Sequence, residues 1–155
     1  MALTRANVEV ILIKRVGALM TQAGLDGTTV DGTNVDLNDP IGYSIRQLDG
    51  TVADVTNVAD SDLAGIGADD YDQLFDVAEL RLLQNILQNL VLTDIEVGPR
   101  KQWFDQLAKR LEKMVDFKRK LVDDKYALVV PVLSTGVLNL NFAEHDENYI
   151  DELGN

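Results

Sequence analysis

The sequence predicts a mainly α-helical protein: a small antiparallel bundle of about four helices, followed by an extended C-terminal arm. Apolar residues recur at three- and four-residue intervals through most of residues 1–126, as they do on the buried face of a helix. After Tyr126 the apolar run becomes extended and β-branched, and it ends in an acidic tail. A chain of 155 residues fits one domain. We therefore expect a helical domain over 1–126 and an arm over 127–155.

The first helix is expected from about residue 6 to residue 23. Thr4 is a suitable N-cap, and Gly24 suits the position that follows a helix end. The apolar residues of this segment share one helical face, namely Val8, Leu12, Val16, Leu19, Met20 and Ala23. Gly17 lowers helix propensity, so we interpret it as a site of close packing.

Residues 25–37 carry two Asp-Gly pairs, each followed by threonine, and they predict either a small hairpin or a mobile loop. The aspartates of this segment could also suggest a calcium-binding loop. An EF-hand that began at Asp31 would need a glutamate at position 12, where this chain has Gly42. Turn formation is the better interpretation of these acids.

The second helix is expected to start at Asn38-Asp39-Pro40, with Asn or Asp as the cap and Pro40 at the first helical position. Its apolar positions are Ile41, Ile45 and Leu48. Gly50 is expected to end it. One further helical turn is expected over 61–66.

The third helix is expected from about Tyr71 to Leu90, capped by Asp69 or Asp70. Its apolar residues cover an unusually wide arc, which predicts a central helix with neighbours on two sides. One stripe contains Leu74, Val77, Leu80, Leu83, Leu87 and Leu90, and it is widened by Phe75, Leu82 and Ile86. Asp72, Asp76 and Glu79 share a face that suits solvent or a cationic partner.

The fourth helix is expected from Pro99 to about Lys125. The residues expected to face inward are Phe104, Leu107, Leu111, Met114 or Val115, and Leu121 or Val122. The cations expected to cover the remaining surface are Lys109, Arg110, Lys113, Lys118, Arg119 and Lys120. Arg100 and Lys101 occupy the first turn, where the helix dipole disfavours cations, so a partner or an acid is expected nearby.

Beyond Tyr126 the run ALVVPVL, the turn Ser134-Thr135-Gly136 and a second apolar run predict short β segments. Pro131 favours an edge strand, because proline cannot donate to a sheet ladder. The end of the chain is acidic and is expected to be mobile.

Charge is strongly segregated along the chain, whose formal net charge is −12. Residues 25–80 hold thirteen acids against Arg46 alone, and residues 126–155 hold five acids and no Lys or Arg. Residues 100–125 hold nine cations against five acids. Such segments can attract each other, or copies of the chain can meet through them. Nucleic acid and anionic membranes would repel so acidic a chain.

Recognised catalytic patterns are missing from the sequence: there is no P-loop, no dinucleotide-binding glycine motif and no nucleophile elbow. The chain has no cysteine, and its one histidine, His145, lies in the acidic tail. We expect no enzymatic activity and no cofactor. A metal enzyme that uses Asp31 and Asp36 is a minor alternative. No segment resembles a signal peptide or a membrane span, so a soluble protein made inside the cell, with no membrane partner, is expected.

The order of elements resembles a known family. The resemblance covers about residues 38–126: Asn38-Asp39-Pro40-Ile41 opens a short helix that ends in IRQLDG, LFDVAELRLLQNILQNL follows at 74–90, and TDIEVGPRKQW joins it to LAKRLEKMVDFKRKLV. This pattern is similar to the head–tail adaptor, or head-completion, proteins of the neck of tailed bacteriophages. The resemblance carries no catalytic residues.

What the resemblance implies is a structural virion protein, made in the host cytoplasm and located between capsid and tail. Copies in that family form a ring, commonly of twelve, beneath the portal ring, and a tail or second neck protein binds below. The ring extends the DNA channel, and DNA passes without specific binding. Residues 1–126 would then be the adaptor-like domain and 127–155 the docking arm.

Candidate partner-binding residues belong to the arm and to the start of the fourth helix. An extended apolar arm can add a strand to a partner's sheet, and Trp103 suits either a core or an interface. The candidates are Val129, Val130, Val132, Leu133, Val137, Leu138, Leu140, Phe142, Arg100, Lys101 and Trp103. The alternative function is a freestanding acidic interaction module, a regulator or a DNA-mimic inhibitor, which would bind through residues 25–80.

Overall fold

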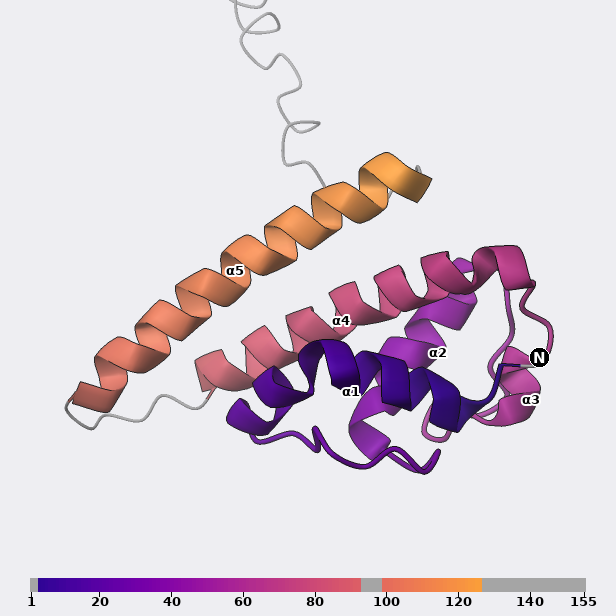
Figure 1. Cartoon of the computed structure of the whole chain (residues 1–155), viewed down its shortest axis with the longest axis horizontal. Coiled ribbons are helices and arrows are strands. Elements are labelled where there is room, and N and C mark those ends of the chain that lie inside the picture. Colours follow the sequence, from indigo (N-terminus) through magenta and orange to yellow (C-terminus); the bar gives the residue numbers. More distant parts are fainter. Residues whose placement is uncertain (1–2, 93–98, 127–155) are drawn as a thin grey trace, which may run out of the picture.

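The chain is mainly helical, as a computed structural model shows for residues 3–92 and 99–126 (Figure 1). Side chains are described for 3–90 and 106–126. The helices are α1 (Arg5–Gln22), α2 (Asn38–Gln47), α3 (Asp60–Leu63), α4 (Tyr71–Leu92) and α5 (Pro99–Tyr126). Short 3-10 turns, Val35–Leu37 and Ala68–Asp70, precede α2 and α4. Residues 25–37 contain no strand, so the hairpin interpretation of that segment is wrong.

The start of α1 confirms the sequence prediction, whereas the start of α2 does not. Thr4 caps α1 by accepting a hydrogen bond from the Asn7 backbone N–H. The residue before α2 is Leu37, which makes no side-chain cap, and Pro40 stands third in the helix. The 3-10 turn leads directly into α2, so neither Asn38 nor Asp39 is needed as a cap. Both side chains bind other elements instead.

The end of α2 differs in a similar way. Gly50 was expected to end the helix, but the residue with positive φ is Asp49, at 59°. Aspartate is among the few non-glycine residues that adopt this conformation readily. The Gly50 backbone N–H then donates to the Ile45 carbonyl and closes the helix end. A side chain at Gly50 would collide with the Ile45 side chain and backbone, which explains the glycine there.

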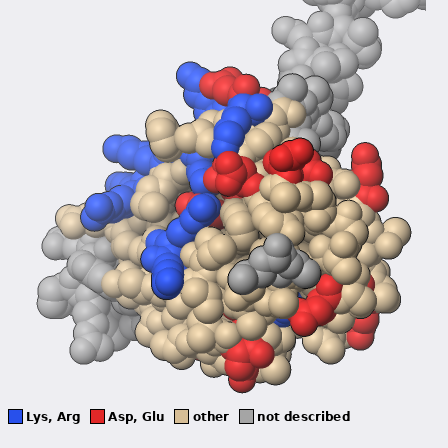
Figure 2. Space-filling view, turned by 45° about the vertical axis from the view of Figure 1, so that its right-hand side comes forward, with Lys and Arg blue, Asp and Glu red and all other residues tan. Residues whose placement is uncertain are grey.

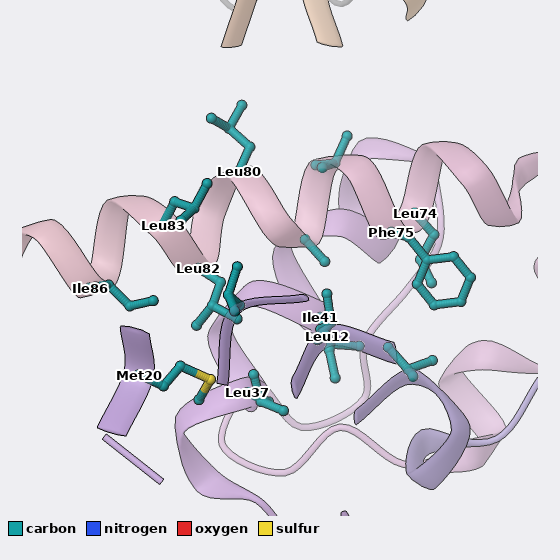
Figure 3. Packing of buried hydrophobic residues seen from close by; sticks show 14 of the residues in the cluster. Leu12, Met20, Leu37, Ile41, Leu74, Phe75, Leu80, Leu82, Leu83 and Ile86 are labelled. Carbon is teal, nitrogen blue, oxygen red and sulfur yellow. The ribbon is translucent and has the colours of Figure 1, made fainter. Parts of the chain in front are cut away.

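Helix α4 is central and packs on two sides, as the width of its apolar arc predicted. It contacts α1, α2 and α5. Leu82 and Ile86 point toward the cluster that contains Met20 and Leu37, whereas Leu80 points to the opposite side of α4 (Figure 3). All five of these side chains are buried. The prediction of neighbours on two sides is confirmed.

Helix α5 runs antiparallel to α4 and rests on it along one side (Figure 1). Among the described side chains of α5, those of residues 106–126, Leu111, Val115 and Val122 are buried. The sequence left two choices open for the inward-facing residues, Met114 or Val115 and Leu121 or Val122. In both cases the valine is buried, and Met114 and Leu121 are exposed. The connection between α4 and α5 lies outside the described residues.

Two glycines let α1 and the following loop meet backbone to backbone. A Cβ atom on Gly27 would lie 2.1 Å from the Gly17 carbonyl oxygen and 2.6 Å from the Thr21 hydroxyl. A Cβ atom on Gly17 would lie 2.8 Å from the Gly27 carbonyl oxygen. The interpretation of Gly17 as a close-packing site is confirmed.

Replacing Gly27 by alanine is expected to destabilise the protein by about 1–3 kcal/mol, the usual cost of overpacking. The neighbour of the added methyl group is backbone, which cannot rotate away. Urea denaturation of Gly27→Ala and Gly65→Ala tests this, because a Cβ atom at Gly65 meets nothing within 4 Å. Equal loss of stability in both variants would contradict the packing argument.

None of the helices in the described part of the chain is long and apolar enough to cross a membrane.

Candidate interaction surfaces

A buried ion pair joins α1 to the two loops that follow it. Arg5 and Glu9 are one helical turn apart, and their Nε and Oε1 atoms lie 2.9 Å apart. The guanidinium also donates to the Asn38 side chain and to the carbonyls of Asn34 and Val58. The carboxylate accepts from the Gly32 and Asn34 backbone N–H groups. Both side chains are almost fully buried, yet their hydrogen bonds are satisfied.

The Asp-Gly loop is organised by a repeated local motif. In Asp26-Gly27-Thr28 and in Asp31-Gly32-Thr33, the carboxylate accepts from both the backbone N–H and the hydroxyl of the threonine two residues later. Asp54-Val55-Thr56 repeats the arrangement. These hydrogen bonds hold the pKa of each aspartate below its usual value. The turn interpretation of Asp31 is therefore confirmed.

An ion cluster fixes α5 to the rest of the domain. Lys118 donates to both Asp76 and Glu79 of α4, each at 2.9 Å. Arg15 of α1 pairs with Glu79 at 2.8 Å. Lys125 and the Tyr126 hydroxyl also reach Asp76. The predicted cationic partner of Asp76 and Glu79 lies within the chain, and Lys118 is only 15% exposed, so its expected role as surface cover is wrong.

This cluster predicts a specific loss of stability in acid. Partial burial opposes ionisation of Asp76, but hydrogen bonds from Lys118, Tyr126 and Lys125 outweigh it and lower the pKa below 3.8. A carboxyl group with a depressed pKa contributes its full stability above its unfolded value and loses that contribution as pH falls through the folded value. Asp76→Asn should therefore lose stability at neutral pH and show a flatter decline below pH 3.8.

Urea denaturation of the wild type and Asp76→Asn, at neutral pH and at steps below pH 4, measures this difference. Asp72→Asn serves as the control, because Asp72 is an exposed aspartate near the start of the same helix and lies outside the ion cluster. Parallel acid profiles for the wild type and Asp76→Asn would show that the cluster is not a source of acid sensitivity.

The side of α5 next to its buried face carries an apolar stripe, defined here as Met114, Phe117 and Leu121. Their spacing of three and four residues places them along one side of the helix. Phe117 is 71% exposed, Met114 38% and Leu121 36%. One hollow is lined by Phe117, Lys120, Leu121, Asp124 and Lys125. A second, nearer the start of α5, is lined by Leu19, Gln22, Leu107, Arg110, Leu111 and Met114.

Exposed cations border this stripe. Arg110, Lys113 and Lys120 are all exposed and lie one turn or less from a stripe residue. Figure 2 shows Lys and Arg gathered toward one side of the view, with Asp and Glu mainly elsewhere. The expected surface positions of Lys109, Arg110, Lys113, Arg119 and Lys120 are confirmed.

A polar hollow of about 350 Å³ is lined by residues from the end of α2, from α3 and from the 3-10 turn before α4. Asp49, Asp62 and Asp70 contribute to its lining. Over residues 3–92 and 99–126, no group of three or more His, Cys, Asp or Glu side chains has an arrangement that could hold a metal ion.

The side chains of the predicted partner-binding residues lie outside the described part of the chain. Arg100, Lys101 and Trp103 lie in the first turns of α5, and their side chains are outside the described residues. The arm candidates between Val129 and Phe142 also lie outside the described residues, as does His145. The sequence pattern does not predict the stripe on α5 as a site, because Met114 and Leu121 are also alternatives for the core and the spacing does not place Phe117.

Comparisons with models of known families, with curated proteins and with solved structures find no match to this chain.

Proposed function

We propose that this chain is a structural protein of a tailed phage, a neck adaptor that forms a ring between portal and tail and extends the DNA channel. It has no catalytic role in this proposal. Its partners are the portal ring, a tail or second neck protein, and copies of itself. The virion neck is its location, and the host cytoplasm is where it is made.

The observation that carries the proposal is the outer side of α5. This helix is anchored by buried residues and by the ion cluster, yet it presents Phe117 and a border of cations outward. A rigid helix with an exposed aromatic residue suits protein–protein contact rather than chemistry on a small molecule. The order of α2, α4 and α5 also agrees with the elements on which the adaptor resemblance depends.

The acidic-module alternative is less well supported. It needs the thirteen acids of residues 25–80 to be available to a basic partner. Nine of them accept hydrogen bonds within the chain: Asp26, Asp31, Asp36, Asp39, Asp54, Asp60, Asp62, Asp76 and Glu79. Most of this charge therefore stabilises loops and helix contacts. The net charge still suits a channel wall, because it would repel passing DNA.

Affinity capture with chemical crosslinking tests the proposal. Full-length tagged protein and a Val132→Asp/Leu138→Asp arm variant are used as baits in lysate from the source cells. The adaptor proposal predicts crosslinks from the wild type to a portal protein, which the arm variant loses. If both baits crosslink instead to the same basic protein through residues 25–80, the acidic-module function replaces it.

A further inference from the structure

The apolar stripe on α5 needs an occupant with particular chemistry. Its three residues are the only run of large exposed apolar side chains at helical spacing in the described part of the chain. Removal of such apolar side chains from water is favourable, so a segment that covers the stripe stabilises the protein. Three exposed cations border the stripe, namely Arg110, Lys113 and Lys120, against one acid that lines its hollow, Asp124. This excess of positive charge favours an occupant that is acidic as well as apolar.

The chain's own C-terminal segment has this chemistry. Residues 127–142 are rich in Val and Leu and include Phe142. Residues 143–155 add five acids, and the whole segment from 127 onward contains no Lys or Arg. It follows Tyr126 directly, and Lys125 already lines the hollow beside Phe117. The complementary sequence therefore begins at the edge of the surface it would cover.

We propose that residues 127–142 of the same chain fold back along α5 and cover the stripe, with the acidic tail beside Arg110 and Lys113. The distance suits this arrangement. From Leu121 back to Leu107 the helix is about 21 Å long, at roughly 1.5 Å per residue. Six or seven extended residues span that length at about 3.3 Å each. The rest of residues 127–142 is then available for the turn that reverses the chain after Tyr126 and for the connection to the acidic tail.

The same chain is a better occupant than a second copy. No linker separates the segment from the stripe, so the local concentration of an attached segment is on the order of millimolar. A second copy would have to reach comparable concentrations in solution. This inference concerns the isolated chain. In the assembled neck of the adaptor proposal, a partner would displace the arm from α5 and bind the stripe, the arm or both.

Paramagnetic broadening in NMR spectra tests the proposal directly. The chain has no cysteine, so Ser134→Cys gives one site for a spin label in the full-length protein. In uniformly labelled protein that carries the spin label, we expect the amide signals of Met114, Phe117 and Leu121 to broaden. A mixed sample, in which the spin label is on unlabelled chains and the isotope is on others, should show no such broadening.

Matched variants separate docking from chance proximity. Phe117→Asp should abolish the broadening. Because Phe117 is exposed, the variant should keep the fold, and unchanged amide signals elsewhere in the protein would show this. Lys120→Glu should weaken it. Arg119→Glu should leave it unchanged, because two residues correspond to about 200° of helix and place Arg119 opposite Phe117.

Three results would overturn the proposal. The first is an absence of broadening along the stripe in the labelled protein. The second is equal broadening in the mixed sample, which would make a second copy the occupant. The third is broadening that persists in Phe117→Asp.

Discussion

Replacing Glu9 by alanine is expected to lower the free energy of unfolding by about 3–5 kcal/mol, the largest effect of any single change proposed here. The carboxylate is fully buried and accepts hydrogen bonds from Arg5, Gly32 and Asn34. Its removal leaves a buried guanidinium without its counter-charge and two backbone N–H groups without an acceptor. Urea denaturation measures the loss.

Two further variants make this prediction specific. Glu112→Ala changes an exposed glutamate of α5 and should alter stability by no more than about 0.5 kcal/mol. The double variant Arg5→Met/Glu9→Leu should lose less than the sum of its single variants, because no unpaired charge remains. A loss below about 1 kcal/mol for Glu9→Ala would show that the network is not needed for the loop arrangement.

Leu111→Ala is expected to destabilise the protein by about 2–5 kcal/mol. Leu111 is fully buried, and it packs on the core together with Val115 and Val122 of α5. Since the apolar contact of α5 with the domain is then reduced, amide hydrogen exchange along α5 should accelerate more than exchange in α1 or α4. Denaturation and hydrogen exchange together measure both effects.

Arg119→Ala provides the matched control on the same helix, because Arg119 is exposed. It should change stability by no more than about 0.5 kcal/mol. If Leu111→Ala behaves like Arg119→Ala, α5 is not packed on the domain in the way described.

Helix existence and the central position of α4 could be predicted from the sequence, because long periodic segments determine both. The choice between Met114 and Val115, or between Leu121 and Val122, could not. Adjacent residues lie about 100° apart, and both fall within the arc that a packed helix covers. Only the position of α4 decides which one becomes buried.

The polar interior was the least predictable part. Arg5 and Glu9 have the spacing of an exposed helical ion pair, and nothing local indicates their burial. Their partners are 25 and 33 residues away in the sequence: Asn34 lies in the loop before α2, and Asn38 is the first residue of α2. Lys118 was assigned to the surface for the same reason, because its acidic partners are 39 and 42 residues away. The stripe on α5 became recognisable only once the buried side of that helix was known.

Immunogold electron microscopy of tailed particles from the source culture tests the proposed place in the phage neck most directly, with an antibody raised against residues 3–126. The adaptor proposal predicts gold at the junction of head and tail on particles opened by mild treatment, and none on capsids or tail tips. Particles without label at that junction, with the protein found only in the soluble fraction, would contradict it.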